Sequence, residues 1–100
     1  MNLQKKKDIH NIFWKKESVL KRANSENIVL TSDHWKVIVV LRSLYINFNT
    51  APNLRILINM LKKKYKNEKW NSVFIFNLFP KGVIRQASYI AGLPKKYICL

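Results

Sequence analysis

The sequence contains few residues of the kinds that most active sites need. Among its 100 residues there are one cysteine, two glycines and five acidic residues. A single cysteine excludes an internal disulfide, so nothing favours an oxidising compartment. Two glycines cannot supply a phosphate-binding loop or a dinucleotide fingerprint. The acidic residues are scattered with no helical pair among them, which argues against paired-carboxylate hydrolysis and two-metal sites.

Histidines and long apolar runs are equally scarce. His10 and His34 lie far apart, and one cysteine with two histidines lacks the spacing of a zinc site, so we expect no metal and no cofactor. His34 should be a partly exposed surface residue in the first turn of a helix. No apolar run approaches the roughly 20 residues of a membrane span, and the N-terminus has no signal-peptide core. A cytoplasmic protein without membrane contact is the simplest expectation.

Positive charge is what the sequence has in excess. Its 19 Lys and Arg residues, only four of them Arg, give a formal net charge of +14. Hydrophobic residues make up 48% of the chain, so it should fold despite this charge. The lysines either serve an anionic partner or reflect a biased genome, and both interpretations stay open.

Hydrophobic periodicity predicts a mainly α protein, a small bundle of about five helices in one domain spanning 1–100. In the longest helix the expected apolar stripe is Trp35, Ile38, Leu41, Tyr45 and Phe48. The helix after it should have Pro52 as its first residue. The apolar segment 72–79 is either central core, which we favour, or a surface for a partner. The expected helices cover 14–24, 32–48 with Thr31 as N-cap, 52–65, a short stretch near 72–79, and 83–91.

The last expected helix lies between the only two glycines, Gly82 and Gly92. Gly92 can adopt the left-handed conformation that ends a helix, Leu93 can fold back on the last turn, and Pro94 prevents continuation. Residues 95–100 should therefore leave the fold as a flexible C-terminal arm.

This arm carries Cys99, the only thiol. A stray cysteine at a chain end can be incidental, but a thiol on a loose end can also be presented to another protein. Lys95 and Lys96 favour the reactive thiolate, whereas the terminal carboxylate of Leu100 opposes it. Thiolate attack on another sulfur depends on access and on the partner's surroundings, which suits a carrier better than a self-contained enzyme.

The C-terminal stretch "LFPKGVIRQASYIAGLPKKYICL" resembles the TusE/DsrC family of small sulfur-carrier proteins. The family pattern runs L-F-P-x-G, Q-A, I-A-G-L-P-K and a penultimate Cys. In this sequence it corresponds to Leu78, Phe79, Pro80, Gly82, Gln86, Ala87, Ile90, Ala91, Gly92, Leu93, Pro94, Lys95 and Cys99. The segments "DHW" at 33–35, "FNTAPNLRIL" at 48–57 and "EKWNS" at 68–72 are similar to family elements in the same order.

The resemblance implies that Cys99 carries a persulfide, so that the protein is a sulfurtransferase with no stand-alone active site. In the TusE branch, sulfur comes from the TusBCD complex and goes to the tRNA 2-thiouridylase for 2-thiolation of the wobble uridine. Direct contact with tRNA is left open. The DsrC branch has a second cysteine eleven residues before the penultimate one, where this chain has Ser88, so the TusE branch is the better match.

The chain departs from the family pattern at several positions. Val83 and Lys96 replace prolines, and Trp70 stands where glycine is usual, which leaves the 66–71 loop conformation open. The family's N-terminal β-hairpin should be shortened or absent, with 1–13 as a ragged N-terminus.

Four basic residues near the arm are candidates for docking an acidic partner or one that holds tRNA: Lys81, Arg85, Lys95 and Lys96. Solvated surface charge is the alternative interpretation for all four. The alternative class for the whole protein is a basic nucleic-acid-binding module, with 32–48 and 52–65 as a helix-turn-helix.

Overall fold

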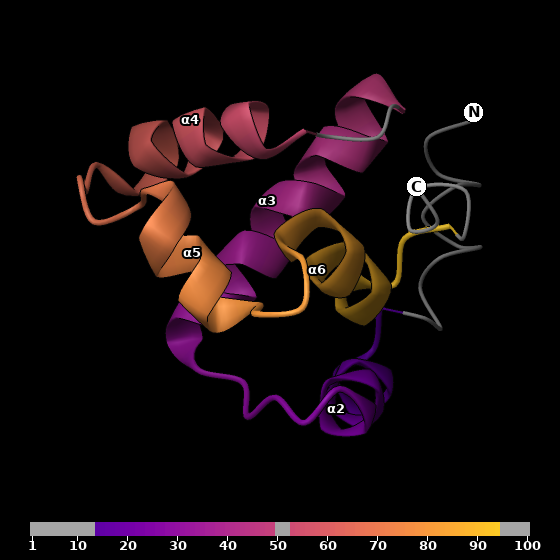
Figure 1. Ribbon diagram of the computed structural model, residues 1–100. Coiled ribbons are helices and arrows are strands. Elements are labelled where there is room, and N and C mark those ends of the chain that lie inside the picture. The colour runs from indigo at the N-terminus through magenta and orange to yellow at the C-terminus, as the bar shows by residue number, and fades with distance from the viewer. Residues whose placement is uncertain (1–13, 50–52, 95–100) are drawn as a thin grey trace.

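The structure is a computed structural model that describes residues 14–49 and 53–94. Within these two ranges it contains five helices and no strand, which confirms the mainly α prediction (Figure 1). Two expectations lie outside the described residues: the ragged N-terminus at 1–13, with the β-hairpin shortened or absent, and the C-terminal arm at 95–100. The helices are α2 (Lys16–Ser25), α3 (Ser32–Phe48), α4 (Leu54–Tyr65), α5 (Ser72–Leu78) and α6 (Val83–Ala91).

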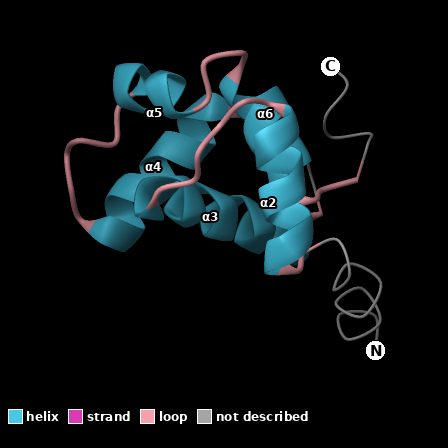
Figure 2. Ribbon diagram, turned by 90° about the horizontal axis from the view of Figure 1, so that it is seen from below, coloured by secondary structure: helices cyan, strands magenta, loops and turns pink. Residues whose placement is uncertain are grey.

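The long helix α3 forms the centre of the bundle, with α4 and α6 both packed against it. Helix α6 also packs on α2 and α5, so the last helix lies between elements from both halves of the chain (Figure 2). No helix in the described ranges is both long enough and apolar enough to cross a membrane.

The apolar face of α3 is wider than the expected stripe. Ile38, Leu41 and Tyr45 are buried as predicted, but Phe48 is 62% exposed, so its assignment to the buried stripe was wrong. Val37, Val40 and Leu44 are buried in addition. A helix that packs against partners on two sides buries more than one narrow stripe, and Phe48 lies in its last turn.

Helix α4 begins later than the sequence predicted. Its N-cap is Asn53, whose side chain accepts a hydrogen bond from the backbone N–H of Ile56, so the first helical residue is Leu54 rather than Pro52. An Asn side chain at this position satisfies a backbone donor that has no partner within the helix. Asn71 caps α5 in the same way.

The short helix α5 is divided between core and surface. Ile75 and the following Phe79 are fully buried, whereas Val73 and Phe76 are 70% and 53% exposed. The preference for core was therefore wrong for Val73 and Phe76. With only two turns, α5 buries the side that faces the other helices and leaves apolar residues of its opposite side exposed.

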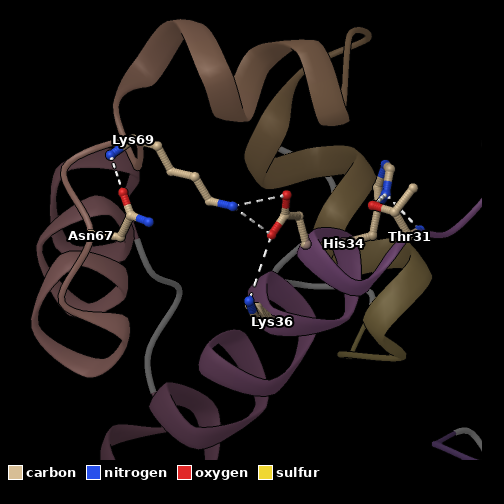
Figure 3. A network of polar contacts seen from close by, with 6 residues as sticks. Thr31, His34, Lys36, Asn67 and Lys69 are labelled. Carbon is tan, nitrogen blue, oxygen red and sulfur yellow. Dashed lines mark hydrogen bonds and ion pairs between the residues drawn. The ribbon is translucent and has the colours of Figure 1, made fainter.

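The 66–71 loop adopts a defined conformation around Trp70. Lys66 has a positive φ of 48°, which ends α4, and the indole of Trp70 is fully buried at 5.3 Å from the Phe74 ring. Lys69 Nζ lies 3.1 and 3.2 Å from the two carboxylate oxygens of Asp33 at the start of α3 (Figure 3). The large Trp70 side chain, at the position that left the loop conformation open, thus serves as a core residue.

His34 is buried, contrary to the expectation of a partly exposed surface residue. Its Nδ1 accepts a hydrogen bond from the backbone N–H of Thr31 at 3.0 Å (Figure 3). Its Nε2 lies 2.9 Å from the carbonyl oxygen of Leu78. The ring also makes an edge contact with Phe79. Because Nδ1 accepts a hydrogen bond and the Leu78 carbonyl oxygen can only accept one, the ring is the neutral tautomer with its proton on Nε2. The His34 side chain thereby joins the start of α3 to the end of α5.

Candidate functional site

The candidate site is the C-terminal end of α6, from which the chain continues toward Cys99. Gly92 has a φ of 85°, as the predicted left-handed helix end requires. Its N–H donates to Tyr89 O, and the N–H of Leu93 donates to Ser88 O at 3.1 Å. Leu93 is 5% exposed and belongs to the core, which confirms that it folds back on the helix.

The next three carbonyls at this helix end accept hydrogen bonds from side chains distant in sequence. Arg22 of α2 donates from Nε and from a terminal nitrogen to Ile90 O, at 3.2 and 3.0 Å. Arg42 of α3 donates from Nε to Ala91 O at 3.0 Å. The indole N–H of Trp14 donates to Gly92 O at 3.1 Å. We call Trp14, Arg22 and Arg42 the carbonyl clamp.

Two members of the carbonyl clamp, Arg42 and Trp14, also contact each other. A second guanidinium nitrogen of Arg42 donates to the backbone oxygen of Trp14 at 3.2 Å, and its guanidinium carbon lies 4.8 Å from the centre of the Trp14 ring. This cation–π contact places the indole between α3 and the end of α6.

The electrostatics of the clamp follow from burying two cations side by side. Burial lowers the pKa of Arg42 to about 10, with the positive charge of Arg22 as a further cause. Burial also lowers the pKa of Arg22, partly opposed by Tyr89. Both guanidinium groups remain charged at neutral pH, and they lie at the negative end of the α6 dipole, where cations are favoured.

At the other end of α6, a second polar group engages one of the predicted docking residues. Arg85 donates to a carboxylate oxygen of Glu26 at 3.0 Å, and the fully buried Gln86 donates to the same oxygen at 2.8 Å. Gln86 also accepts from the backbone N–H of Lys81 at 3.0 Å. The Gln86 hydrogen bond is the main cause of the lowered pKa of Glu26. Arg85 therefore has an internal partner, whereas the side chain of Lys81 is exposed.

The remaining predicted site residues, Cys99, Lys95 and Lys96, lie outside the described residues. Ser88, at the position of the second cysteine of the DsrC branch, is fully buried in α6, and its hydroxyl has no hydrogen-bond partner within 14–49 and 53–94. The structure thus brings Lys81 and Arg85 together at the start of α6, while the predicted thiol follows its opposite end.

The described part of the chain shows no cluster of three metal-ligating side chains. Two surface hollows, of about 230 and 320 Å³, lie between α3 and α4 and beside α5, and neither is lined by a residue of the last turn of α6. What the arrangement can do is hold the base of the C-terminal segment.

Sequence reasoning missed the carbonyl clamp. Its members are separated by at least eight positions and share no motif, so local patterns could not connect them. One signal was available: only four of the 19 basic residues are Arg, and the forked guanidinium is suited to several hydrogen bonds at once.

The five-helix fold and the Gly92 cap of α6, followed in the sequence by a penultimate cysteine, are typical of a small helical protein of the DsrC-like class. The sequence profile described as DsrC like protein matches residues 3–100, so the chain belongs to this family. The NMR structure of Allochromatium vinosum DsrC is similar to this structure, with a TM-score of 0.74 and 39% identity over 82% of this chain and 73% of that one.

Curated relatives point to one branch of the family. The chain is 46% identical over 98 residues to a protein of Buchnera aphidicola from Acyrthosiphon pisum named Sulfurtransferase TusE, covering 98% of this chain and 82% of the relative. Proteins of the same name from Photorhabdus laumondii and Escherichia coli are 45% and 40% identical over 87% of this chain, which spans 78% and 80% of their lengths. The predicted resemblance to the TusE/DsrC family is confirmed.

Proposed function

We propose that this protein is a cytoplasmic sulfur-relay protein, a sulfurtransferase that carries sulfur as a persulfide on Cys99. Sulfur arrives from a TusBCD-like donor complex and passes to the tRNA 2-thiouridylase for 2-thiolation of the wobble uridine. The names of the relatives support the sulfurtransferase role. The observation that carries the proposal is that α6 ends at a Gly92 cap, a few residues before the only thiol of the chain.

The transfer is an exchange between sulfur atoms with no net oxidation. The Cys99 thiolate attacks the terminal sulfur of a donor persulfide, R–S–SH. The donor S–S bond breaks, and its electron pair leaves with the inner sulfur as the thiolate R–S⁻. Cys99 becomes Cys99–S–SH, and the acceptor enzyme's thiolate removes the terminal sulfur by the same step.

The surroundings of α6 support a carrier rather than an independent enzyme. Within residues 14–49 and 53–94 there is no group of three side chains that could hold a metal ion. The segment from Pro94 to Cys99 spans five residue steps, a reach of roughly 17 Å when extended at about 3.4 Å per residue. A thiol with this reach can enter the cleft of a donor and then that of an acceptor.

Lysines are the better candidates for docking these partners. Arg85 is engaged by Glu26, so its role in docking would require exchange of an existing ion pair. Lys81 is exposed, and Lys95 and Lys96 flank the path to Cys99 in the sequence. We propose these three lysines as contacts for an acidic partner or for tRNA held by the acceptor.

Intact-protein mass spectrometry tests the carrier role. After incubation with a persulfide donor, the wild-type chain should gain the mass of one sulfur atom, removable by a thiol reductant, and fragmentation should place it on Cys99. The Cys99→Ser variant should gain none and should relay no sulfur. A Cys99→Ser chain that still carried sulfur would refute the proposal.

The alternative function, a basic nucleic-acid-binding module built on α3 and α4, makes a different prediction. Its binding should weaken steeply with salt and survive Cys99→Ser, because phosphate contacts do not need the thiol. Measuring duplex and tRNA binding of both chains across salt concentrations separates the two functions.

A further inference from the structure

The surface between α3 and α4 has no part in the relay function proposed above. These two helices pack against each other, and α4 lies on the opposite side of the bundle from α2 (Figure 1). The hollow of about 230 Å³ between them is lined by three residues of each helix: Val39, Val40 and Ser43 of α3, and Met60, Lys63 and Lys64 of α4. We call these six residues the α3–α4 groove.

The apolar part of the α3–α4 groove continues along α4. Val40 is 2% exposed and belongs to the core, whereas Val39 is 44% exposed. Met60 is half-buried, and Ile56, four residues before it on the same side of the helix, is 45% exposed. Methionine adapts its shape to different apolar partners and is common at binding surfaces. A run of exposed apolar side chains beside a hollow is typical of an interaction surface.

One side of the α3–α4 groove is positively charged. Lys63 and Lys64 are exposed in the last turn of α4 and line the hollow. Within residues 14–49 and 53–94, no ion pair involves either of them, whereas the adjacent Lys62 lies 3.7 Å from Glu68. No acidic residue lines the hollow. The two ammonium groups are therefore matched only by negative charge from outside the groove.

The composition of the α3–α4 groove favours a protein segment over a small ligand or a nucleic acid. Small-molecule pockets usually measure about 300–1,000 Å³, so an open hollow of about 230 Å³ is better suited to one or two apolar side chains. Phosphate contacts are made by charged and polar groups and need no apolar floor, and unpaired bases stack on aromatic rings. None of the six groove residues is aromatic or an arginine.

Charge complementarity decides which protein segment fits. A second copy of the chain carries the same net charge of +14, and a symmetric contact would bring two sets of lysines into one interface with no acidic groove residue to balance them. The chain's own segments outside the described residues are basic too. Residues 1–13 include three lysines and one acidic residue, and 95–100 include two lysines and no acidic side chain. An acidic segment of another protein matches both the apolar floor and the lysines.

We infer that the α3–α4 groove binds an acidic amphipathic helix of a partner protein. An apolar side chain of that helix fills the hollow, and its Asp or Glu residues lie beside Lys63 and Lys64. A surface between two packed helices is suited to a third helix that presents apolar residues at i, i+3, i+4 and i+7. The inference does not rest on the relay function of Cys99, because no groove residue belongs to α6 or to the segment after it.

NMR titration of the isotope-labelled full-length chain with a model helix tests the inference. The probe is a blocked peptide of about 18 residues with leucines at i, i+3, i+4 and i+7 and glutamates on both sides of this stripe. The amide signals of the groove residues should shift, with a Kd of about 10–200 µM. A second peptide with lysine in place of every glutamate should bind at least about tenfold more weakly, because it meets like charges.

Charge variants assign the acidic side of the contact. Lys63→Gln combined with Lys64→Gln should weaken binding of the acidic peptide about three- to tenfold. The matched control is Lys16→Gln combined with Lys21→Gln, which removes two exposed charges of α2. This control should change the Kd by less than about twofold, because it lowers the net charge equally but leaves the groove intact.

Apolar variants assign the floor. Val39→Thr keeps the shape of the side chain but places a hydroxyl in the contact, and it should weaken binding about three- to fivefold. Val29→Thr makes the same replacement at a position that is 86% exposed in the loop before α3, so it should bind like the wild type. Because all these positions are exposed, the variants should keep the wild-type spectrum outside the substituted sites.

Four results would overturn the inference. The first is no shift of the groove signals with the acidic peptide up to about 2 mM. The second is equal binding of the acidic and basic peptides, and the third is an equal loss in the control variants. The fourth is another occupant: tRNA that shifts the groove signals at lower concentration than the peptide, or a dimer in sedimentation that uses this surface. The mapping on the wild-type chain holds even if a variant fails to fold, and sulfur loading of Cys99 is measured separately.

Discussion

Replacing Gln86 by Leu should destabilise the protein through two specific hydrogen bonds. Gln86 is fully buried; it donates to the Glu26 carboxylate at 2.8 Å and accepts from the Lys81 backbone N–H at 3.0 Å. A hydrogen bond to a charged group contributes about 1.5–3 kcal/mol and a neutral one about 0.5–1.5 kcal/mol. Leucine has a similar volume, so no large cavity adds to the cost. We expect the free energy of unfolding to fall by about 2–4 kcal/mol.

Urea denaturation followed by tryptophan fluorescence measures this loss. Asn59→Leu is the matched control, because it also replaces an amide by leucine but on the exposed face of α4, and it should change stability by less than about 0.5 kcal/mol. A loss below about 1 kcal/mol for Gln86→Leu would show that these bonds do not hold the turn before α6 to the end of α2.

The same variant should change the response to acid. Glu26 has a lowered pKa in the folded state, chiefly because Gln86 donates to it. A carboxylate with a lowered folded pKa stabilises the protein above its unfolded pKa, and this stability is lost as the pH falls through the folded pKa. Gln86→Leu should therefore lose less stability than the wild type between about pH 5 and pH 3. Equal acid sensitivity of the two chains would contradict this assignment.

Two further predictions concern the other buried polar and aromatic groups. Burial lowers the pKa of His34 in the folded protein. The stability that the neutral imidazole contributes should therefore be full above the unfolded pKa, about 6.5, and should decrease as the pH falls toward the folded pKa. Thermal melts across this pH range should show the decrease for the wild type and not for His34→Gln. Trp70→Ala should lower the free energy of unfolding in urea by about 3–5 kcal/mol, because removing a fully buried indole leaves a cavity. Val73→Ala, on the exposed face of α5, is the control. A loss for Trp70→Ala no larger than that for Val73→Ala would argue against a core role for Trp70.

The parts of the fold that the sequence predicted well are those set by neighbouring residues. Gly92, Leu93 and Pro94 predict the end of α6, because the left-handed residue ends the helix and a proline two positions later prevents its continuation. The amphipathic pattern of α4 likewise places Leu57 and Leu61 in the core. Such features depend on chain geometry within one or two turns, which the sequence shows directly.

The incorrect predictions concern the burial of side chains, which depends on how helices pack in the folded protein. Phe48 fits the helical period of α3 but lies in its last turn, and Val73 and Phe76 are apolar but lie on the outer face of α5. His34 looked like a surface residue because its partner, the carbonyl of Leu78, is 44 positions away. The sequence placed the expected carrier thiol on a segment after α6, but it could not reveal the clamp at the base of that segment.

The distribution of arginine and lysine bears on whether the high positive charge is functional. Arg22, Arg42 and Arg85 each donate to a defined acceptor in another part of the chain, whereas Arg55 is exposed. Most of the 19 basic residues are lysines, which supply charge without fixed geometry. A genome bias toward lysine would replace arginine by lysine at every position where only a positive charge is needed. The arginines of the clamp are therefore explained by the hydrogen bonds they donate, and any contribution of overall charge to partner binding rests with the lysines and the exposed Arg55.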